Sequence, residues 1–117
     1  MARFPRRARL LRPDDFKAAF ESGQREQLPL FTAVVRGNET QQPRLGLAVA
    51  RKAVPLAITR NRIKRHVRES FRLHQDRLPD VDLVILPRPA AGKATAAELR
   101  HQLERLWTRL AEKWPKS

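Results

Sequence analysis

Residues 59–72 read TRNRIKRHVRESFR, and this stretch carries the strongest structural signal in the chain. Ile63, Val67 and Phe71 recur at four-residue spacing, and no glycine or proline interrupts them. Apolar residues at this spacing form a stripe along one side of an α-helix. We therefore predict a helix from residue 59 or 60 to about residue 75, with its apolar side packed against the rest of the domain.

The opposite side of this predicted helix is almost entirely basic. Counting Arg60, it carries six cations against the single acid Glu69. Helix faces that contact only water usually mix Glu with Lys, whereas this many like charges repel one another unless a polyanion compensates them. Arginine suits such a partner because its guanidinium group binds phosphate oxygens bidentately and stacks on bases. The pattern predicts a nucleic-acid-binding face made of Arg60, Asn61, Arg62, Lys64, Arg65, Arg68 and Arg72.

The segment before this helix predicts a short helix and two strands. Pro13 followed by two aspartates is a typical helix start, and the next glycine suggests a helix over residues 13–22. Residues 28–36 and 45–50 are rich in β-prone side chains and are separated by the polar, turn-rich stretch 37–43. We expect these two segments to be neighbouring antiparallel strands.

The segment after the basic helix predicts a further strand and a last helix. Residues 81–86 are largely apolar and bounded by prolines, which favours a strand in the sheet interior. Thr95 and Glu98 have the spacing of a capping box, and apolar residues then follow the helical period up to Trp114. The fold class is therefore α+β: one small domain with a central, mostly antiparallel sheet of about four strands packed with three helices.

Composition limits the function. The 117 residues carry a net charge of +13, and residues 43–79 hold ten basic and two acidic residues, a larger excess than either flanking segment. A polyanion is the expected partner, with nucleic acid ahead of a membrane surface. The chain has no cysteine, which excludes disulfides, a thiol nucleophile and a zinc ribbon. No stretch is apolar enough to span a membrane, and we expect a cytoplasmic protein.

The sequence predicts one domain between two short terminal segments. We assign residues 1–12 to a basic N-terminal arm, residues 13–114 to a single RNA-binding domain and residues 115–117 to a tail. The arm lacks the apolar block of a signal peptide. Its Arg-rich, acid-poor composition fits either an arm that binds phosphates or an organelle transit peptide.

Residues 60–65, Arg-Asn-Arg-Ile-Lys-Arg, continued by Arg68-Glu69 and Phe71-Arg72, resemble the signature of the bacterial ribonuclease P protein subunit. Residues 44–52 resemble the strand before the crossover of that family, and residues 82–88 resemble its last strand. With the segment from Arg9 to Phe20, similar to the family's first helix, the resemblance covers roughly residues 9–110.

The resemblance implies a protein that assists a catalytic RNA in removing the 5′ leader from precursor tRNA. It implies that the RNA subunit carries the chemistry with Mg²⁺ held mainly by the RNA, that the chain has no catalytic residue, and that its partners are ribonuclease P RNA and precursor tRNA. It also implies a left-handed β-α-β crossover. We expect no membrane contact, and the resemblance does not imply a protein partner. The basic helix would contact the catalytic RNA, and a cleft would hold the leader with Phe16, Lys17, Phe20, Arg51 and Lys52.

Several alternatives stay open on the residues alone. Phe16 and Phe20, four apart on an amphipathic helix, equally suit a core position. Many family members carry an aromatic residue on the next strand, where Thr32 to Val34 stand here, and Phe31 could replace it or face the other side of the sheet.

The residues also leave the catalytic role and the partner class open. The three histidines form no pair by spacing. The aspartates at positions 14, 15, 80 and 82 are better explained as a helix cap and loop solvation, and the alternative is that either pair helps to hold a magnesium ion near RNA. A ribosomal type of RNA-binding protein shares this composition. A DNA-binding helix-turn-helix fits less well, because strand-like segments flank the basic helix.

Overall fold

The computed structural model describes residues 12–114, and the predicted arm, apart from Arg12, and the predicted tail lie outside the described residues. Three helices, two 3-10 helices and four strands follow one another along this part of the chain. In order they are α2 (Pro13–Ser22), β1 (Gln24–Gln27), β2 (Phe31–Gly37), β3 (Arg44–Leu47), α3 (Ala57–His74), η1 (Gln75–Arg77), β4 (Val81–Pro87), η2 (Pro89–Lys93) and α4 (Ala96–Lys113).

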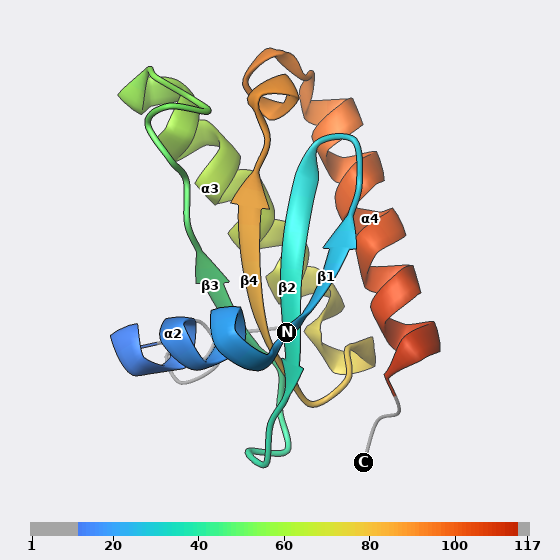
Figure 1. The fold of residues 1–117 in the computed structure, drawn as a ribbon. Helices are drawn as coiled ribbons and strands as arrows, with labels where there is room; N and C mark the ends of the chain where they lie inside the picture. Colours follow the sequence, from blue (N-terminus) through green and yellow to red (C-terminus); the bar gives the residue numbers. More distant parts are fainter. Residues whose placement is uncertain (1–11, 115–117) are drawn as a thin grey trace.

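The four strands form one sheet in the order β1-β2-β4-β3. The β1–β2 and β2–β4 pairs are antiparallel, and the β3–β4 pair is parallel. Figure 1 shows α2 in front of the sheet and α3 and α4 behind it. Because β3 and β4 run upward with β4 to the right and α3 behind, the β3-α3-β4 connection is left-handed, against the general preference. The α+β fold and its crossover are therefore confirmed.

The predicted pairing of the two N-terminal strand segments is wrong. The segment 28–36 is not one strand, because Leu28 N–H donates to the carbonyl of Phe31 (2.8 Å) in a turn that joins β1 to β2. The neighbours of β2 are β1 and β4, so β4 separates it from β3. The physical reason is that β4 is apolar on both faces: Val84 packs towards α2, and Leu83 and Ile85 pack towards α3 and α4. Such a strand is most stable in the sheet interior, as predicted for residues 81–86.

The predicted helices are confirmed, with one shifted boundary. Residues 13–22 form α2 with the expected bounds, and α3 begins two residues before the predicted start. At the start of α4, Thr95 Oγ1 accepts from Glu98 N–H (3.1 Å), and Glu98 Oε1 accepts from Thr95 N–H (2.8 Å). These reciprocal bonds are the predicted capping box.

Helix α2 approaches the sheet closely at its C-terminal end. A Cβ atom at Gly23 would lie 2.4 Å from the carbonyl oxygen of Ala19 and 2.7 Å from Cγ1 of Val34. Only glycine leaves room for this approach, so the residue that ends α2 also sets its distance from β2.

Packing and a buried hydrogen bond fix the orientation of α3. Its buried residues are Ile63, Val67 and Phe71, as predicted from the helical period, together with Ser70. Trp107 of α4 donates from Nε1 to Ser70 Oγ (2.8 Å), and its ring meets Phe71 edge-on with centroids 6.1 Å apart. The side of α3 that faces solvent is therefore determined by the core.

Candidate RNA interface

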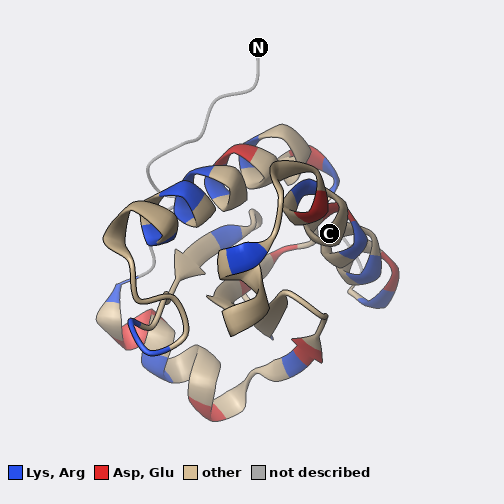
Figure 2. Ribbon diagram, turned by 90° about the horizontal axis from the view of Figure 1, so that it is seen from above, with Lys and Arg blue, Asp and Glu red and all other residues tan. Residues whose placement is uncertain are grey.

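The outward face of α3 is basic along its length. Figure 2 shows lysine and arginine recurring along this helix. A shallow depression of about 370 Å³ lies on the helix surface. It is lined by Asn61, Lys64, Arg65, Arg68, Glu69 and Arg72, so four of its six side chains are cations and one is an acid.

Three cations of this face have no intramolecular partner. Within residues 12–114, the side chains of Lys64, Arg65 and Arg68 make no hydrogen bond or ion pair. Each is carried by a helix whose other side is fixed in the core. The charges are thus held in position by the backbone while their hydrogen-bond donors stay available for an external anion.

The other three predicted cations are already in contact with the protein. The guanidinium of Arg60 donates to the carbonyl oxygens of Val54 (3.0 Å) and Pro55 (2.7 Å). Arg62 donates to the carbonyl oxygen of Ala94 (3.1 Å), and Arg72 pairs with Glu69. The side chain of Arg60 is therefore directed towards the residues just before α3, and that of Arg62 towards the residues just before α4.

The basic surface continues beside His66 from α3 towards α4, where Arg100 lies. Burial lowers the pKa of the His66 imidazole below its usual value, and the charges of Arg62, Arg100 and Arg65 lower it further. Arg100 belongs to α4, 34 positions after His66 in the sequence. Arg100 could not be assigned to this surface from the sequence, because only the fold brings α4 close to α3.

The two aromatic side chains of α2 differ in exposure. Phe16 is half-buried and packs against a small cluster containing Val34 and Val84. Phe20 is 40% exposed. Lys17 lies between them in sequence, with its ammonium group 4.0 Å from the carboxylate of Glu21 in an exposed pair. Phe20 and Lys17 are therefore accessible, whereas Phe16 is partly a core residue.

Arg51 and Lys52 lie at a different place from the other residues predicted to hold the leader. Both are exposed in the turn that follows β3. Figure 1 places this turn beside the start of α3, and α2 crosses the opposite end of the sheet. The five residues thus form two groups, one at each end of β3, and not one compact cleft.

Phe31 cannot supply an aromatic surface on the α2 side. Its side chain is fully buried in the core cluster between the sheet and the helices α3 and α4. Neighbouring strand residues point to opposite faces, so Thr32 and Val34 point towards α2. The exposed aromatic surface on that side of the described residues comes from α2.

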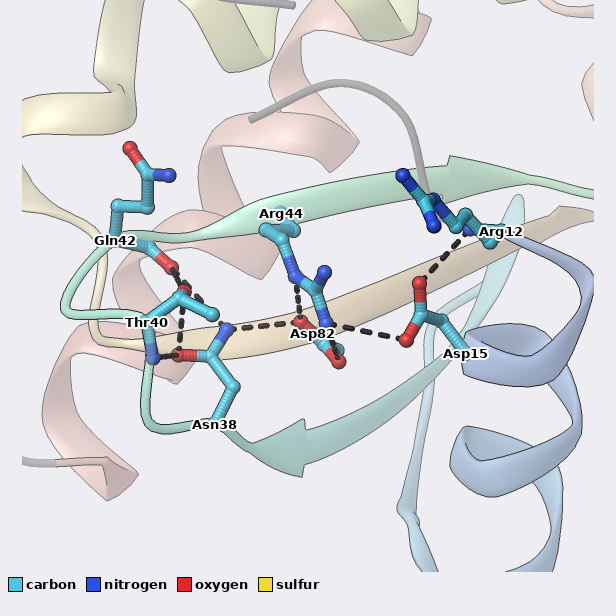
Figure 3. A network of polar contacts seen from close by, with 7 residues as sticks. All are labelled: Arg12, Asp15, Asn38, Thr40, Gln42, Arg44 and Asp82. Atoms are coloured by element: carbon cyan, nitrogen blue, oxygen red, sulfur yellow. Dashed lines mark hydrogen bonds and ion pairs between the residues drawn. The ribbon is translucent and has the colours of Figure 1, made fainter. Parts of the chain in front are cut away.

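A polar cluster joins α2 to the sheet (Figure 3). Arg44 on β3 donates from Nε and Nη2 to both carboxylate oxygens of Asp82 on β4, at 2.7 Å each. The same Nη2 lies 3.3 Å from Oδ1 of Asp15 on α2, and Asn38 donates to Asp82 Oδ1 (2.8 Å). Hydrogen bonding to Asp82 raises the pKa of Arg44.

The expectation that Asp82 solvates a loop is therefore wrong. The residue is only 2% exposed, and its carboxylate accepts hydrogen bonds from two side chains. A buried charge is tolerated because Arg44 neutralises it. Asp15, in contrast, does act at the helix start, where it accepts from Arg12 N–H (2.9 Å).

The chain is similar in sequence to known proteins along most of its length. The family model described as Ribonuclease P matches residues 4–111. A ribonuclease P protein component from Yersinia pestis is 46% identical over 114 residues, which cover 97% of this chain and 96% of the relative. One from Thioalkalivibrio sulfidiphilus is 44% identical, covering 92% of this chain and 90% of the relative. The chain belongs to the ribonuclease P protein family.

Solved structures of this family share the fold. The protein from Thermotoga maritima superposes with a TM-score of 0.77 at 33% identity, covering 86% of this chain and 96% of the other. The protein from Staphylococcus aureus gives a TM-score of 0.80 at 26% identity, covering 90% and 95%. As a ribonuclease P protein, the chain is the protein component of a tRNA-processing enzyme.

The carboxylates and histidines of this ribonuclease P protein are spread over the described residues. No group of three or more His, Asp or Glu side chains comes together in residues 12–114. The buried carboxylates are engaged elsewhere, Asp82 by Arg44 and Glu26 by Lys113 (2.8 Å).

The other two histidines lie on different helices, His74 on α3 and His101 on α4. His74 lies 3.9 Å from Glu104, and His101 is exposed on α4. Among the described helices, none is long and apolar enough to cross a membrane.

Proposed function

We propose that this chain binds the catalytic RNA of a ribonuclease P ribonucleoprotein through the outward face of α3. The observation that carries the proposal is the set of unpartnered cations Lys64, Arg65 and Arg68 on a helix fixed by its buried side. A folded RNA presents closely spaced phosphates, and neutralising them releases counterions. Guanidinium groups held at fixed spacing lose little conformational entropy on binding, which favours this contact.

The α2 side of the sheet is proposed to hold the 5′ leader of precursor tRNA. Phe20 offers an exposed ring on which a base can stack, and Lys17 lies three residues away on the same helix. Arg51 and Lys52 would contact phosphates at the other end of β3. A leader that follows the edge of the sheet could reach both groups, which explains why they need not form one cleft.

The proposed roles of the protein and of the RNA follow from the chemistry of the protein side chains. On this proposal the RNA holds Mg²⁺ and performs the cleavage. The protein residues bind and orient the two RNAs: cations of α3 contact the catalytic RNA, and α2 contacts the substrate. Neutralising phosphates reduces the magnesium concentration that the RNA needs in order to fold and to hold its substrate.

The proposal is tested by cleavage of a precursor tRNA at low Mg²⁺ concentration. Three reactions are compared: the protein alone, a bacterial ribonuclease P RNA alone, and both together. We expect mature 5′ ends chiefly in the mixture. A mixture no faster than the RNA alone would leave a general RNA-binding protein, and cleavage by the protein alone would contradict an RNA-based mechanism.

A further inference from the structure

Residues 55–58, Pro-Leu-Ala-Ile, form an apolar run that is exposed at every position. Leu56 is 66% exposed and Ile58 is 79% exposed, the highest values among the large apolar side chains of residues 12–114. Figure 1 places this run at the start of α3, at a corner of the molecule. Consecutive exposed apolar residues are costly to solubility and usually mark a contact surface. We call residues 55–58 the apolar tip.

The backbone of the apolar tip is held in place. Arg60 donates from its guanidinium to the carbonyl oxygens of Val54 and Pro55, and its backbone N–H donates to the carbonyl of Leu56 (3.0 Å). Val54 is itself buried in the core. Leu56 and Ile58 are therefore presented by an anchored segment, so little backbone entropy is lost when a partner packs on them.

The surroundings of the apolar tip favour an anionic partner. No Asp or Glu occurs from Thr40 to Arg68, whereas eight Lys or Arg residues do. Arg51 and Lys52 are exposed just before the tip, and the outward face of α3 begins at Asn61 just after it. A phosphate-rich partner that covers the α3 face is thus brought up against the tip.

We propose that the apolar tip packs against unpaired bases of the RNA that binds the outward face of α3. This inference rests on the proposed function and names a chemical class of contact within it. RNA exposes flat apolar surfaces only where bases are unpaired, because paired bases are stacked inside the helix. The phosphate contacts of Arg65 and Arg68 depend on the salt concentration. The burial of Leu56 and Ile58 adds a contribution to binding that does not depend on it.

The experiment compares RNA affinity of the full chain with that of the double variant Leu56→Ser/Ile58→Ser, using a bacterial ribonuclease P RNA over a range of salt concentrations. Leu56 is the residue that precedes the first turn of α3, where serine is preferred, and serine and isoleucine have similar helix propensities. The variant is therefore expected to stay folded. We expect about tenfold weaker binding at every salt concentration, with the salt slope of the wild type.

The matched control is Leu73→Ser. Leu73 is 59% exposed and lies at the other end of the same helix, so the change removes one exposed large apolar side chain outside the tip. We expect the control to bind as the wild type does. Equal affinity of the double variant and the wild type would overturn the inference, and so would a loss that changes the salt slope. Failure of the wild type to bind the RNA at all would instead overturn the proposed function.

A photo-cross-linking amino acid at position 58 identifies the partner directly. Cross-links to unpaired nucleotides support the inference. Cross-links confined to base-paired nucleotides, or to a second copy of the chain, overturn it.

Discussion

Arg44 and the arginines on the outward face of α3 have the same side chain and opposite surroundings. Arg44 contacts two carboxylates, one of them buried, and connects three elements of the fold. Arg65 and Arg68 contact no carboxylate in the described part of the chain. The difference shows that the number of cations does not identify an RNA-binding surface. What distinguishes the proposed RNA-binding face is a set of cations on a fixed helix whose side chains have no partner inside the described part of the protein.

The largest expected effect is on folding, from Arg44→Ala. Removing the guanidinium leaves the carboxylate of Asp82 buried without a counter-charge, which should lower the free energy of unfolding by about 3 kcal/mol. Chemical denaturation measures this change. Adding Asp82→Asn to the variant should restore part of the stability, because the buried charge is then gone. Equal stability of the single and double variants would contradict the role assigned to this pair.

The next effect is on RNA affinity, from Arg65→Ala and Arg68→Ala. Each should weaken binding to the catalytic RNA about tenfold and reduce the slope of log K against log salt by roughly 0.7 to 0.9. Folding stability should change by no more than about 0.5 kcal/mol, because neither side chain has an intramolecular partner. Arg25→Ala on the edge strand β1 is the control, since it removes an exposed cation from the edge of the sheet opposite to β3. Equal losses of RNA affinity in all three variants would contradict the assignment of the outward face of α3 as the RNA-binding surface.

A smaller effect is expected from Phe20→Ala on substrate discrimination. Loss of the exposed ring should reduce the affinity of the assembled enzyme for precursor tRNA several-fold, within the roughly 1–3 kcal/mol of a base stacked on an aromatic ring. Binding of leaderless tRNA should not change. Phe16→Ala is less informative, because Phe16 also packs against Val34 and Val84 and its loss would destabilise the fold. An equal effect on both tRNAs would argue against a leader contact at α2.

The smallest expected effect is a pH dependence of RNA affinity from His66. Burial and three arginines lower the pKa of His66 in the free protein, and RNA phosphates would offset those arginines and raise it again. Binding should therefore take up protons, so affinity should rise two- to threefold from about pH 7.5 to about pH 5.5. His66→Gln should flatten this dependence, whereas His101→Gln should not.

The folding stability of the free protein should respond to pH in the opposite direction. The unfolded chain binds the proton of His66 more readily than the folded protein does, so stability should fall as pH drops below the ordinary value of 6.5. A fall of RNA affinity with decreasing pH would contradict the proposed position of His66 beside RNA.

The features predicted from sequence are those that depend on local periodicity. The buried side of α3 follows from the spacing of Ile63, Val67 and Phe71, and the start of α4 follows from Thr95 and Glu98. The interior position of β4 follows from its continuous apolar character. These signals are contained within single segments, so one sequence is sufficient to read them.

The features that sequence reasoning missed depend on contacts between distant segments. Strand β1, Gln-Arg-Glu-Gln, has no β-prone residue, and its buried Glu26 forms ion pairs with Lys113 and Arg109 of α4. Arg44 and Asp82 are 38 positions apart and meet because β3 lies beside β4. The exposure of Leu56 likewise depends on which elements cover the start of α3, which the spacing of its residues does not determine.

The central position of β4 also has a consequence for the order of folding. The hairpin β1–β2 and the strand β3 are made earlier on the ribosome, but they do not pair with each other, and the sheet stays in two parts until residues 81–87 arrive. The buried side of α3 packs on that same strand. Contacts between residues far apart in sequence form slowly, so a nascent chain would expose the basic segment for some time before the helix is docked. The arrangement of arginines on α3 is thus completed late in synthesis, after the strand that closes the sheet and the helix α4 that fixes the orientation of α3.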